Sequence, residues 1–238
     1  MTAALLLQHD AGVTTLTLSR PERGNALAPD LVEALLAAAT QACADNHVNT
    51  LVLRGAGKHF CTGLDLSDLA SSSDADWLHR LVRIETLLAL LWHAPLRTVA
   101  VAQGRTWGAG ADLFACCELR VAAADTSFRF PGAQFAVVLG TRRLAERIGT
   151  DAARRLVIDG AELSAAAAMD AGLVSQTNDG SLLEFPSPKV SAPTAAAIRA
   201  ASRSDHRDAD LAALVRSAAE PGLRERMLAY RARSSAKA

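Results

Sequence analysis

The chain has 238 residues, of which 50% are apolar, and its 25 basic and 25 acidic side chains cancel to no net charge. This size and composition predict one large globular domain, or one domain with a small appendage. The balanced charge argues against nucleic acid or a membrane as a partner. Because the N-terminus resembles neither a signal peptide nor a membrane span, we expect a cytoplasmic protein.

The chain opens with a predicted β-hairpin. Residues 3–7 and 13–18 flank a turn, and the second run alternates apolar residues with threonine, as a half-exposed strand does. A helix is predicted over residues 29–44 and a buried strand over residues 49–53. A turn that contains glycine, residues 59–66, follows this strand.

A longer amphipathic helix is predicted over residues 74–93. Ser73 and Asp76 match a capping box at its start, and Pro95 closes it. One face of this helix is apolar and predicts a buried stripe formed by Trp77, Leu81, Ile84, Leu88 and Leu91.

The rest of the chain is organised around residues 98–124. A strand-like run at residues 99–102 passes through a glycine-rich turn into a helix that begins near Ala111 and Asp112. Small residues let a ligand approach the main chain, and the free N–H groups of a helix start favour negative charge, so this turn suits an oxyanion. Asp112 either takes part in that chemistry, or it caps the helix or complements its dipole.

The second half of the chain is predicted to be mostly helical. Strands are expected at residues 126–130 and 173–175, and helices at residues 139–148, 150–158, 164–171, 193–202, 208–219 and 221–233, with Thr150 and Ser164 in capping positions. Residues 178–189 lack periodicity and are predicted to form a mobile linker. Strands that alternate with helices predict an α/β domain with a largely parallel core sheet. The spacing of Cys43, Cys61, Cys116 and Cys117 indicates buried thiols rather than disulfides or a zinc site.

Four motifs, in order along the chain, resemble those of the crotonase superfamily, also called the enoyl-CoA hydratase/isomerase family. LSRPERGNAL, residues 18–27, is similar to the family's LNRP…NAL segment, and residues 59–66 are similar to its F-x-x-G-x-D-L oxyanion turn. Residues 103–118 resemble its NG…GGG-x-E-L…CD segment, and residues 158–174 resemble its TG…A-x-x-A…GLV segment. The resemblance covers nearly the whole chain.

This resemblance implies a crotonase-like spiral of ββα units with the acyl-CoA site over residues 1–177. A linker and a C-terminal helical trimerisation region would follow over residues 178–238. It also implies an acyl-CoA enzyme of fatty acid metabolism, a lyase or an isomerase, that forms a homotrimer or a dimer of trimers. Neither a metal nor a separate cofactor is expected, since coenzyme A enters as part of the substrate.

By position, the family's two main-chain donors to the thioester carbonyl fall on the N–H groups of Leu64 and Ala109. Each such donor stabilises an enolate oxygen by roughly 3–4 kcal/mol. Because Ala109 replaces a usual glycine, a positive φ there would cost about 1 kcal/mol and displace the donor. The substrate-binding positions implied by the resemblance are Arg23, Ala26, Lys58, Gly63, Asp65 and Gly108. For the two cations, an ordinary solvated surface charge is the alternative.

The chain departs from the family at the two catalytic glutamates of its hydratases. The first position is Asp112, whose side chain is one methylene shorter, and the second is Gly132, which carries no carboxylate. A single acid–base group favours isomerisation, decarboxylation or thioester hydrolysis over efficient hydration. A replacement group could come from Glu85, His79, Arg142, Gln134 or Thr141, for which ordinary packing or an exposed helix face is the alternative.

The leading hypothesis is an enzyme of the enoyl-CoA hydratase/isomerase type in which two main-chain N–H groups stabilise a thioester enolate and Asp112 moves the proton. The alternative is a catalytically degenerate crotonase that binds acyl-CoA, or serves as an assembly subunit, without turnover. Deuterium uptake at the α carbon of a bound thioester distinguishes these two hypotheses.

Overall fold

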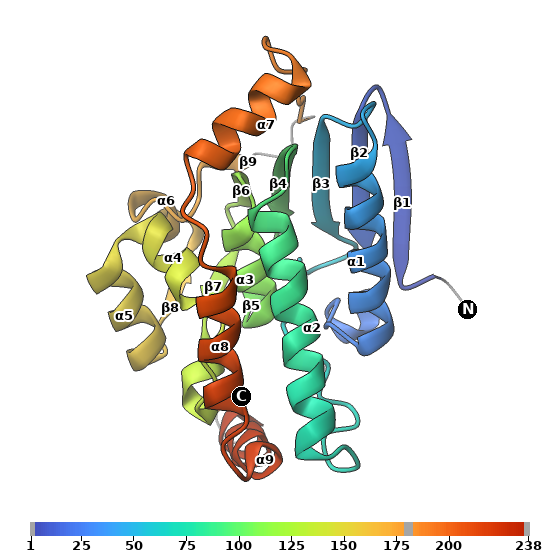
Figure 1. Ribbon diagram of the computed structural model, residues 1–238. Helices are drawn as coiled ribbons and strands as arrows, with labels where there is room; N and C mark the ends of the chain where they lie inside the picture. Colours follow the sequence, from blue (N-terminus) through green and yellow to red (C-terminus); the bar gives the residue numbers. More distant parts are fainter. Residues whose placement is uncertain (1–2, 179–182, 236–238) are drawn as a thin grey trace.

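The computed structural model describes residues 3–178 and 183–235, and a six-stranded sheet runs through its centre (Figure 1). The sheet contains β1 (Leu5–Asp10), β2 (Val13–Leu18), β3 (Thr50–Gly55), β4 (Arg97–Ala102), β6 (Leu119–Ala123) and β9 (Gln176–Asn178), in the order β1-β2-β3-β4-β6-β9. The neighbours from β2 to β9 are parallel, and β1 is antiparallel to β2. The predicted α/β class, hairpin and largely parallel sheet are confirmed.

A smaller sheet contains β5 (Arg105–Trp107), β7 (Ser127–Arg129) and β8 (Glu162–Ser164). β5 and β7 are parallel, and an isolated parallel bridge joins Cys61 to Thr106. β5 and β7 each follow a strand of the large sheet and precede a helix, as the predicted ββα spiral requires. The sequence analysis placed no strand at β5 or β8, because three-residue strands carry no usable periodicity.

Helices cover one face of the sheet and extend beyond one end of it (Figure 1). They are α1 (Pro29–Ala44), α2 (Asp74–Trp92), α3 (Ala109–Cys116), α4 (Thr141–Ile148), α5 (Thr150–Asp159), α6 (Ala165–Asp170), α7 (Ala192–Ala201), α8 (Arg207–Ala218) and α9 (Leu223–Ser235), with short 3-10 turns at Pro21–Arg23 and Pro131–Phe135, the latter labelled η2. The capping box of Ser73 and Asp76 is present, and the predicted apolar stripe of α2 is buried. No helix in the two described ranges is both long and apolar enough to cross a bilayer.

Two local predictions are wrong. Residues 173–175 are not a strand: Leu173 and Val174 are buried where the chain leaves α6, and pairing with β6 starts only at Gln176. Thr150 does not cap α5, because it is already the first helical residue. Ser164 does cap α6, by accepting a hydrogen bond from Ala167 N. Part of the predicted linker, residues 179–182, lies outside the described residues.

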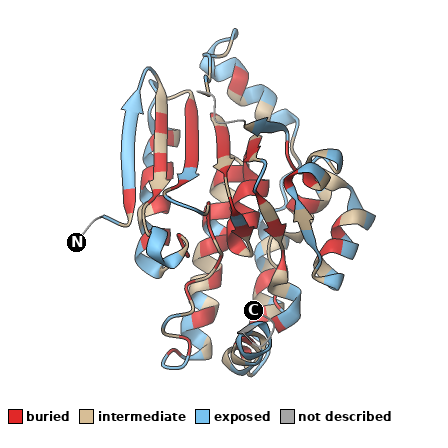
Figure 2. Cartoon of the chain, turned by 180° about the vertical axis from the view of Figure 1, so that it is seen from behind, coloured by how far each residue is buried: buried red, intermediate tan, exposed pale blue. Residues whose placement is uncertain are grey.

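The described residues form a main core and two smaller apolar clusters, one of which consists of Val52, Val99 and Val121 on the central strands. The main core lies against the sheet. It includes Phe114, whose ring contacts the rings of both Phe60 and Phe128. Figure 2 shows this burial concentrated in the central strands, whereas β1 is exposed along most of its length. The other small cluster joins α2, η2, α8 and α9 and includes Trp77, Leu81, Phe135, Leu214 and Met227. The C-terminal helices α8 and α9 therefore pack directly onto the part of the chain that contains the candidate site.

Candidate active site

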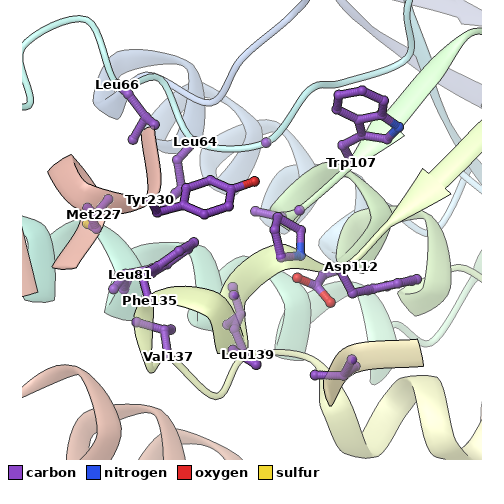
Figure 3. A pocket seen from close by; sticks show the side chains of 18 of the residues that line it. Leu64, Leu66, Leu81, Trp107, Asp112, Phe135, Val137, Leu139, Met227 and Tyr230 are labelled. Atoms are coloured by element: carbon purple, nitrogen blue, oxygen red, sulfur yellow. The ribbon is translucent and has the colours of Figure 1, made fainter. Parts of the chain in front are cut away.

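A cavity of about 110 Å³ lies between the end of β5 with the start of α3 on one side and η2, α2 and α9 on the other (Figure 3). Its wall is largely apolar and includes Leu81, Phe135, Val137 and Leu139. Among the described residues that line it, Asp112 has the only carboxylate. The cavity thus combines an apolar wall with one acid.

Two turns meet at the edge of this cavity. Leu64 and Ala109 each lie three residues beyond the Cys61–Thr106 bridge, so the bridge sets both turns in register. Gly63 has φ +98°, and a Cβ added to it would lie 3.0 Å from Trp107 O and 3.5 Å from Ala109 N. The absence of a side chain at Gly63 is therefore what lets the two turns approach each other.

The N–H groups of Leu64 and Ala109 have no acceptor among the described residues. Their neighbours do: Asp65 N donates to Leu27 O (3.2 Å), and Gly108 N donates to Arg129 O (2.8 Å). Both Leu64 and Ala109 line the cavity, and Ala109 is the first residue of α3. Two N–H groups, one of them at a helix N-terminus, are thus free to receive an oxygen that carries negative charge.

Ala109 carries no left-handed backbone strain. Among the described residues other than glycine, only Ala11, Asn25 and Ala136 have a positive φ. The cost considered for an alanine in place of glycine at this position therefore does not arise, because the backbone is already helical there.

Asp112 lies in the first turn of α3 and is 6% exposed. α3 has no side-chain cap, so Asp112 does not cap the helix, but its place in the first turn does complement the helix dipole. A Cβ added to Gly140, just before α4, would lie 2.1 Å from Asp112 Oδ1, so the carboxylate rests against a bare backbone. Burial raises the pKa of Asp112 well above its usual range, although the nearby Arg143 guanidinium opposes this shift.

Four of the five candidate replacement groups do not line the cavity. Glu85 is 2% exposed and binds Arg143 through two hydrogen bonds of 2.5 and 3.0 Å. Arg142 is paired with Asp210 (2.6 Å), and His79 is exposed on α2. These residues hold α2, α4 and α8 together or face solvent. Of the other candidates, Thr141 lines the cavity and Gln134 does not.

The remaining predicted site residues fall into two groups. Gly63 and Gly108 line the cavity, whereas Arg23, Ala26, Lys58 and Asp65 do not. Arg23 and Lys58 are exposed, and Ala26 is buried next to Leu27, whose N–H donates to Gly63 O (2.8 Å). The loop of residues 23–27 therefore runs directly beside the turn at Leu64.

Asp65 is bound within the protein. Its carboxylate accepts hydrogen bonds from Arg20 Nη1 (2.8 Å) and Ser67 N (3.0 Å). Burial acts to raise the pKa of Asp65, but these hydrogen bonds outweigh it and the pKa is lowered. Asn25 similarly ties the loop to its neighbours by donating to Ala56 O and His59 O. Arg20 and Asn25, which the sequence analysis assigned no role, thus fix the loop that borders the site.

The sequence analysis also missed the contribution of α9. Met227 and Tyr230, more than 100 positions after Asp112, line the cavity and lie three residues apart on one helix face. The only sequence signal was that Tyr230 is the single tyrosine of the chain. No group of three or more His, Cys, Asp or Glu side chains in the described part of the chain is arranged to hold a metal ion.

Comparison with known proteins identifies a family that matches this chain. A family model described as "Enoyl-CoA hydratase/isomerase" matches residues 8–202. The "Probable enoyl-CoA hydratase echA6" of Mycobacterium leprae is 36% identical over 171 residues, which are 69% of this chain and 67% of that protein. Its counterpart in Mycobacterium bovis is 35% identical over 167 residues, 69% of this chain and 66% of that protein. The chain thus spans about two thirds of the length of these relatives.

Solved structures agree with the sequence comparison. A Bordetella parapertussis protein described as an enoyl-CoA hydratase/isomerase superposes with a TM-score of 0.90 and 37% identity, over 96% of this chain and 98% of that one. An enoyl-CoA hydratase of Bacillus halodurans, at 17% identity, has a TM-score of 0.80 over 95% of this chain and 100% of that one. This second likeness concerns the fold alone.

Proposed function

The chain belongs to the enoyl-CoA hydratase/isomerase family, and from this premise we propose that it binds an acyl-CoA thioester with the carbonyl oxygen between the N–H groups of Leu64 and Ala109. One observation supports the proposal above all: two N–H groups without an acceptor border the same apolar cavity as a single carboxylate. Preorganised donors at a developing oxyanion contribute roughly 3–4 kcal/mol each. They lower the cost of removing a proton from the α carbon.

We assign that proton transfer to Asp112. A general base works best when its pKa lies near the working pH, and burial moves the pKa of Asp112 in this direction. Gly132 lines the cavity at the position where a second carboxylate is expected and supplies none. Isomerisation of a double bond, or another reaction that needs one carboxylate, is therefore favoured over efficient hydration.

The cavity favours a short acyl group, since about 110 Å³ is well below the roughly 300–1,000 Å³ of pockets that enclose drug-sized ligands. Gly63 and Gly108 would allow the thioester to approach the main chain. The loop of residues 23–27 runs beside Leu64, so Arg23 and Ala26 are proposed contacts of the nucleotide, with Lys58 a phosphate partner and Asp65 a support of the loop. A cytosolic location, a homotrimer or dimer of trimers, and the absence of any cofactor besides substrate coenzyme A belong to the same proposal.

The test is proton exchange in heavy water. The protein is incubated with short 2-enoyl- and 3-enoyl-CoA esters in D2O, and α-deuterium and product are followed by NMR and mass spectrometry. Wild type should exchange the α proton, and Asp112→Asn should lose this exchange by about 100-fold or more. Asp170→Asn, at an exposed carboxylate on α6, is the matched control and should behave as wild type. Tight acyl-CoA binding by wild type without exchange would instead support the degenerate crotonase, whose best argument is the missing acid at Gly132.

A further inference from the structure

A second side chain that can release a proton reaches the cavity. Among the described residues that line it, only Asp112 and Tyr230 are ionisable. Figure 3 shows the Tyr230 hydroxyl pointing into the cavity from α9, whereas Asp112 enters from the side of α3. No hydrogen bond to the Tyr230 hydroxyl is present among the described residues, so its proton is free for a ligand.

The other polar groups on the wall are less suited to this role. Trp107 Nε1 already donates to Ser127 Oγ (3.0 Å). Thr62 and Thr141 present aliphatic hydroxyls, which are much weaker acids than a phenol. Tyr230 is therefore the best proton donor apart from the Asp112 carboxyl.

Tyr230 is held in place by its own chain. Its ring packs against Phe135 of η2, with ring centroids 5.3 Å apart. Arg226, one turn earlier on α9, donates from Nε to Phe135 O (3.1 Å), and Met227 is 1% exposed. The phenol thus extends into the cavity from a helix that is fixed both by polar contacts and by apolar burial.

We propose that Tyr230 is the second proton-transfer group of this cavity and takes the place of the carboxylate that is absent at Gly132. The inference rests on the proposed function. For a 3-enoyl thioester, the Asp112 carboxylate takes the α proton, and the C–H electron pair moves into a dienolate. The γ carbon then forms a C–H bond with the proton of Tyr230 Oη. The resulting phenolate regains a proton from the Asp112 carboxylic acid, directly or through water, which restores both groups.

Asp112 alone would have to serve both carbons. A single carboxylate can carry the proton from the α to the γ carbon only if it reaches both, and an aspartate reaches less far than a glutamate. Division of the two transfers between groups on opposite walls removes this requirement. It also determines where a solvent deuteron enters the product.

The experiment follows that deuteron. Wild type and variants convert a short 3-enoyl-CoA in D2O, and NMR assigns the deuterium in the first product formed. Wild type should place deuterium at the γ carbon, because the phenol hydroxyl exchanges with solvent. Tyr230→Phe keeps the ring and its packing on Phe135. It should keep α exchange within a few fold of wild type while isomerisation falls by about 100-fold. Ala229→Ser, which adds a hydroxyl to an exposed position of α9, should match wild type.

Each other outcome is decisive. Isomerisation at the wild-type rate in Tyr230→Phe would overturn the inference and leave the proposed function intact. An equal loss of α exchange and isomerisation in Tyr230→Phe would also overturn it, because a role in packing or binding predicts that pattern. Absence of α exchange in wild type would overturn the proposed function, and the inference with it, before any variant is needed.

Discussion

The Asp112 side chain is 6% exposed, and its carboxylate receives no hydrogen bond from the described residues. Burial raises its pKa well above the usual range, so the folded protein holds this proton more tightly than the unfolded chain does. Below the unfolded pKa of about 3.9, Asp112 is protonated in both the folded and the unfolded state, so its burial as a charge does not lower the free energy of unfolding. As the pH rises from there through the folded pKa, stability is lost, at about 1.4 kcal/mol for each unit by which the pKa is raised.

Replacement of Asp112 by asparagine should therefore stabilise the protein while it inactivates the site. The gain in the free energy of unfolding should be small near about pH 4 and should grow as the pH increases, because only the wild type has to bury a charge. Urea denaturation of both proteins across this pH range measures the difference. A gain that does not depend on pH would contradict the assignment of a raised pKa.

The same raised pKa predicts the pH dependence of activity. In wild type, kcat/KM should rise with pH along an acidic limb that lies well above the ordinary carboxyl range, since the ionised form is the base.

Gly140 sets the position of the same carboxylate. It has φ +68°, and a Cβ on it would overlap Asp112 Oδ1 at 2.1 Å. Gly149 has a similar φ of +83°, but a Cβ there would have nothing within 4 Å. An alanine at Gly140 carries the cost of a left-handed backbone, about 1 kcal/mol, and displaces Asp112. Gly149 has ψ 152°, in a backbone region almost confined to glycine, so an alanine there costs about 1–3 kcal/mol but displaces no neighbour.

Gly149→Ala should thus lower the free energy of unfolding by about 1–3 kcal/mol and leave α exchange unchanged. Gly140→Ala should also lose stability and, unlike Gly149→Ala, should reduce α exchange by about 10-fold or more, because the base must move away from the α carbon. Urea denaturation and the D2O assay measure the two effects. If the two variants have equal α exchange, Gly140 does not position the base.

At the scale of elements, α9 is joined to α2 by one carboxylate. Asp74, in the first turn of α2, accepts hydrogen bonds from Gly222 N (2.9 Å), Leu223 N (3.1 Å) and Arg224 N (2.8 Å). The backbone hydrogen bond from Arg224, with those from Gly222 and Leu223, lowers the pKa of Asp74 against the opposing effect of desolvation. This cap therefore stabilises α9 above the unfolded pKa of aspartate and is lost as the pH falls through the lowered folded value.

Asp74→Ala should loosen α9 without unfolding α2, whose own capping box of Ser73 and Asp76 remains. Amide hydrogen exchange should accelerate in α9 and little elsewhere, and isomerisation should fall because Tyr230 loses its fixed position. Hydrogen-exchange mass spectrometry with the D2O assay measures both. Asp208→Ala, at an exposed acid in the first turn of α8, is the control and should change neither. Unchanged protection of α9 in Asp74→Ala would show that apolar burial alone holds the helix.

In the molecule as a whole, the features that could be predicted from the sequence are those that depend on neighbouring residues in the chain. The periodicity of residues 29–44 predicts α1 with its observed bounds, and the glycine turns at Gly63 and Gly108 are located by their motifs. The wall that α9 contributes has no such signal, because Tyr230 reaches the cavity through contacts between segments more than 90 positions apart. For the same reason, the partners of Glu85 could not be predicted. From the sequence, Glu85 cannot be told from an acid on the surface, because Arg143 is distant along the chain and contacts Glu85 only in the folded protein.

The last prediction concerns the interface in the proposed trimer or dimer of trimers. Ile198, on α7, is 57% exposed, and Val190, 47% exposed, lines the same hollow with it. Apolar side chains grouped in this way are typical of an interface between copies. Light scattering should give wild type a mass of three or six chains of 25.0 kDa, and Ile198→Asp should lower it. Leu7→Asp, on the edge strand β1, is an equally exposed control that should keep the wild-type mass. Asp112, Leu64, Ala109 and Tyr230 all come from one chain, so the dissociated Ile198→Asp protein should retain α exchange. If light scattering gives wild type the mass of a single chain, the proposed trimer or dimer of trimers is wrong.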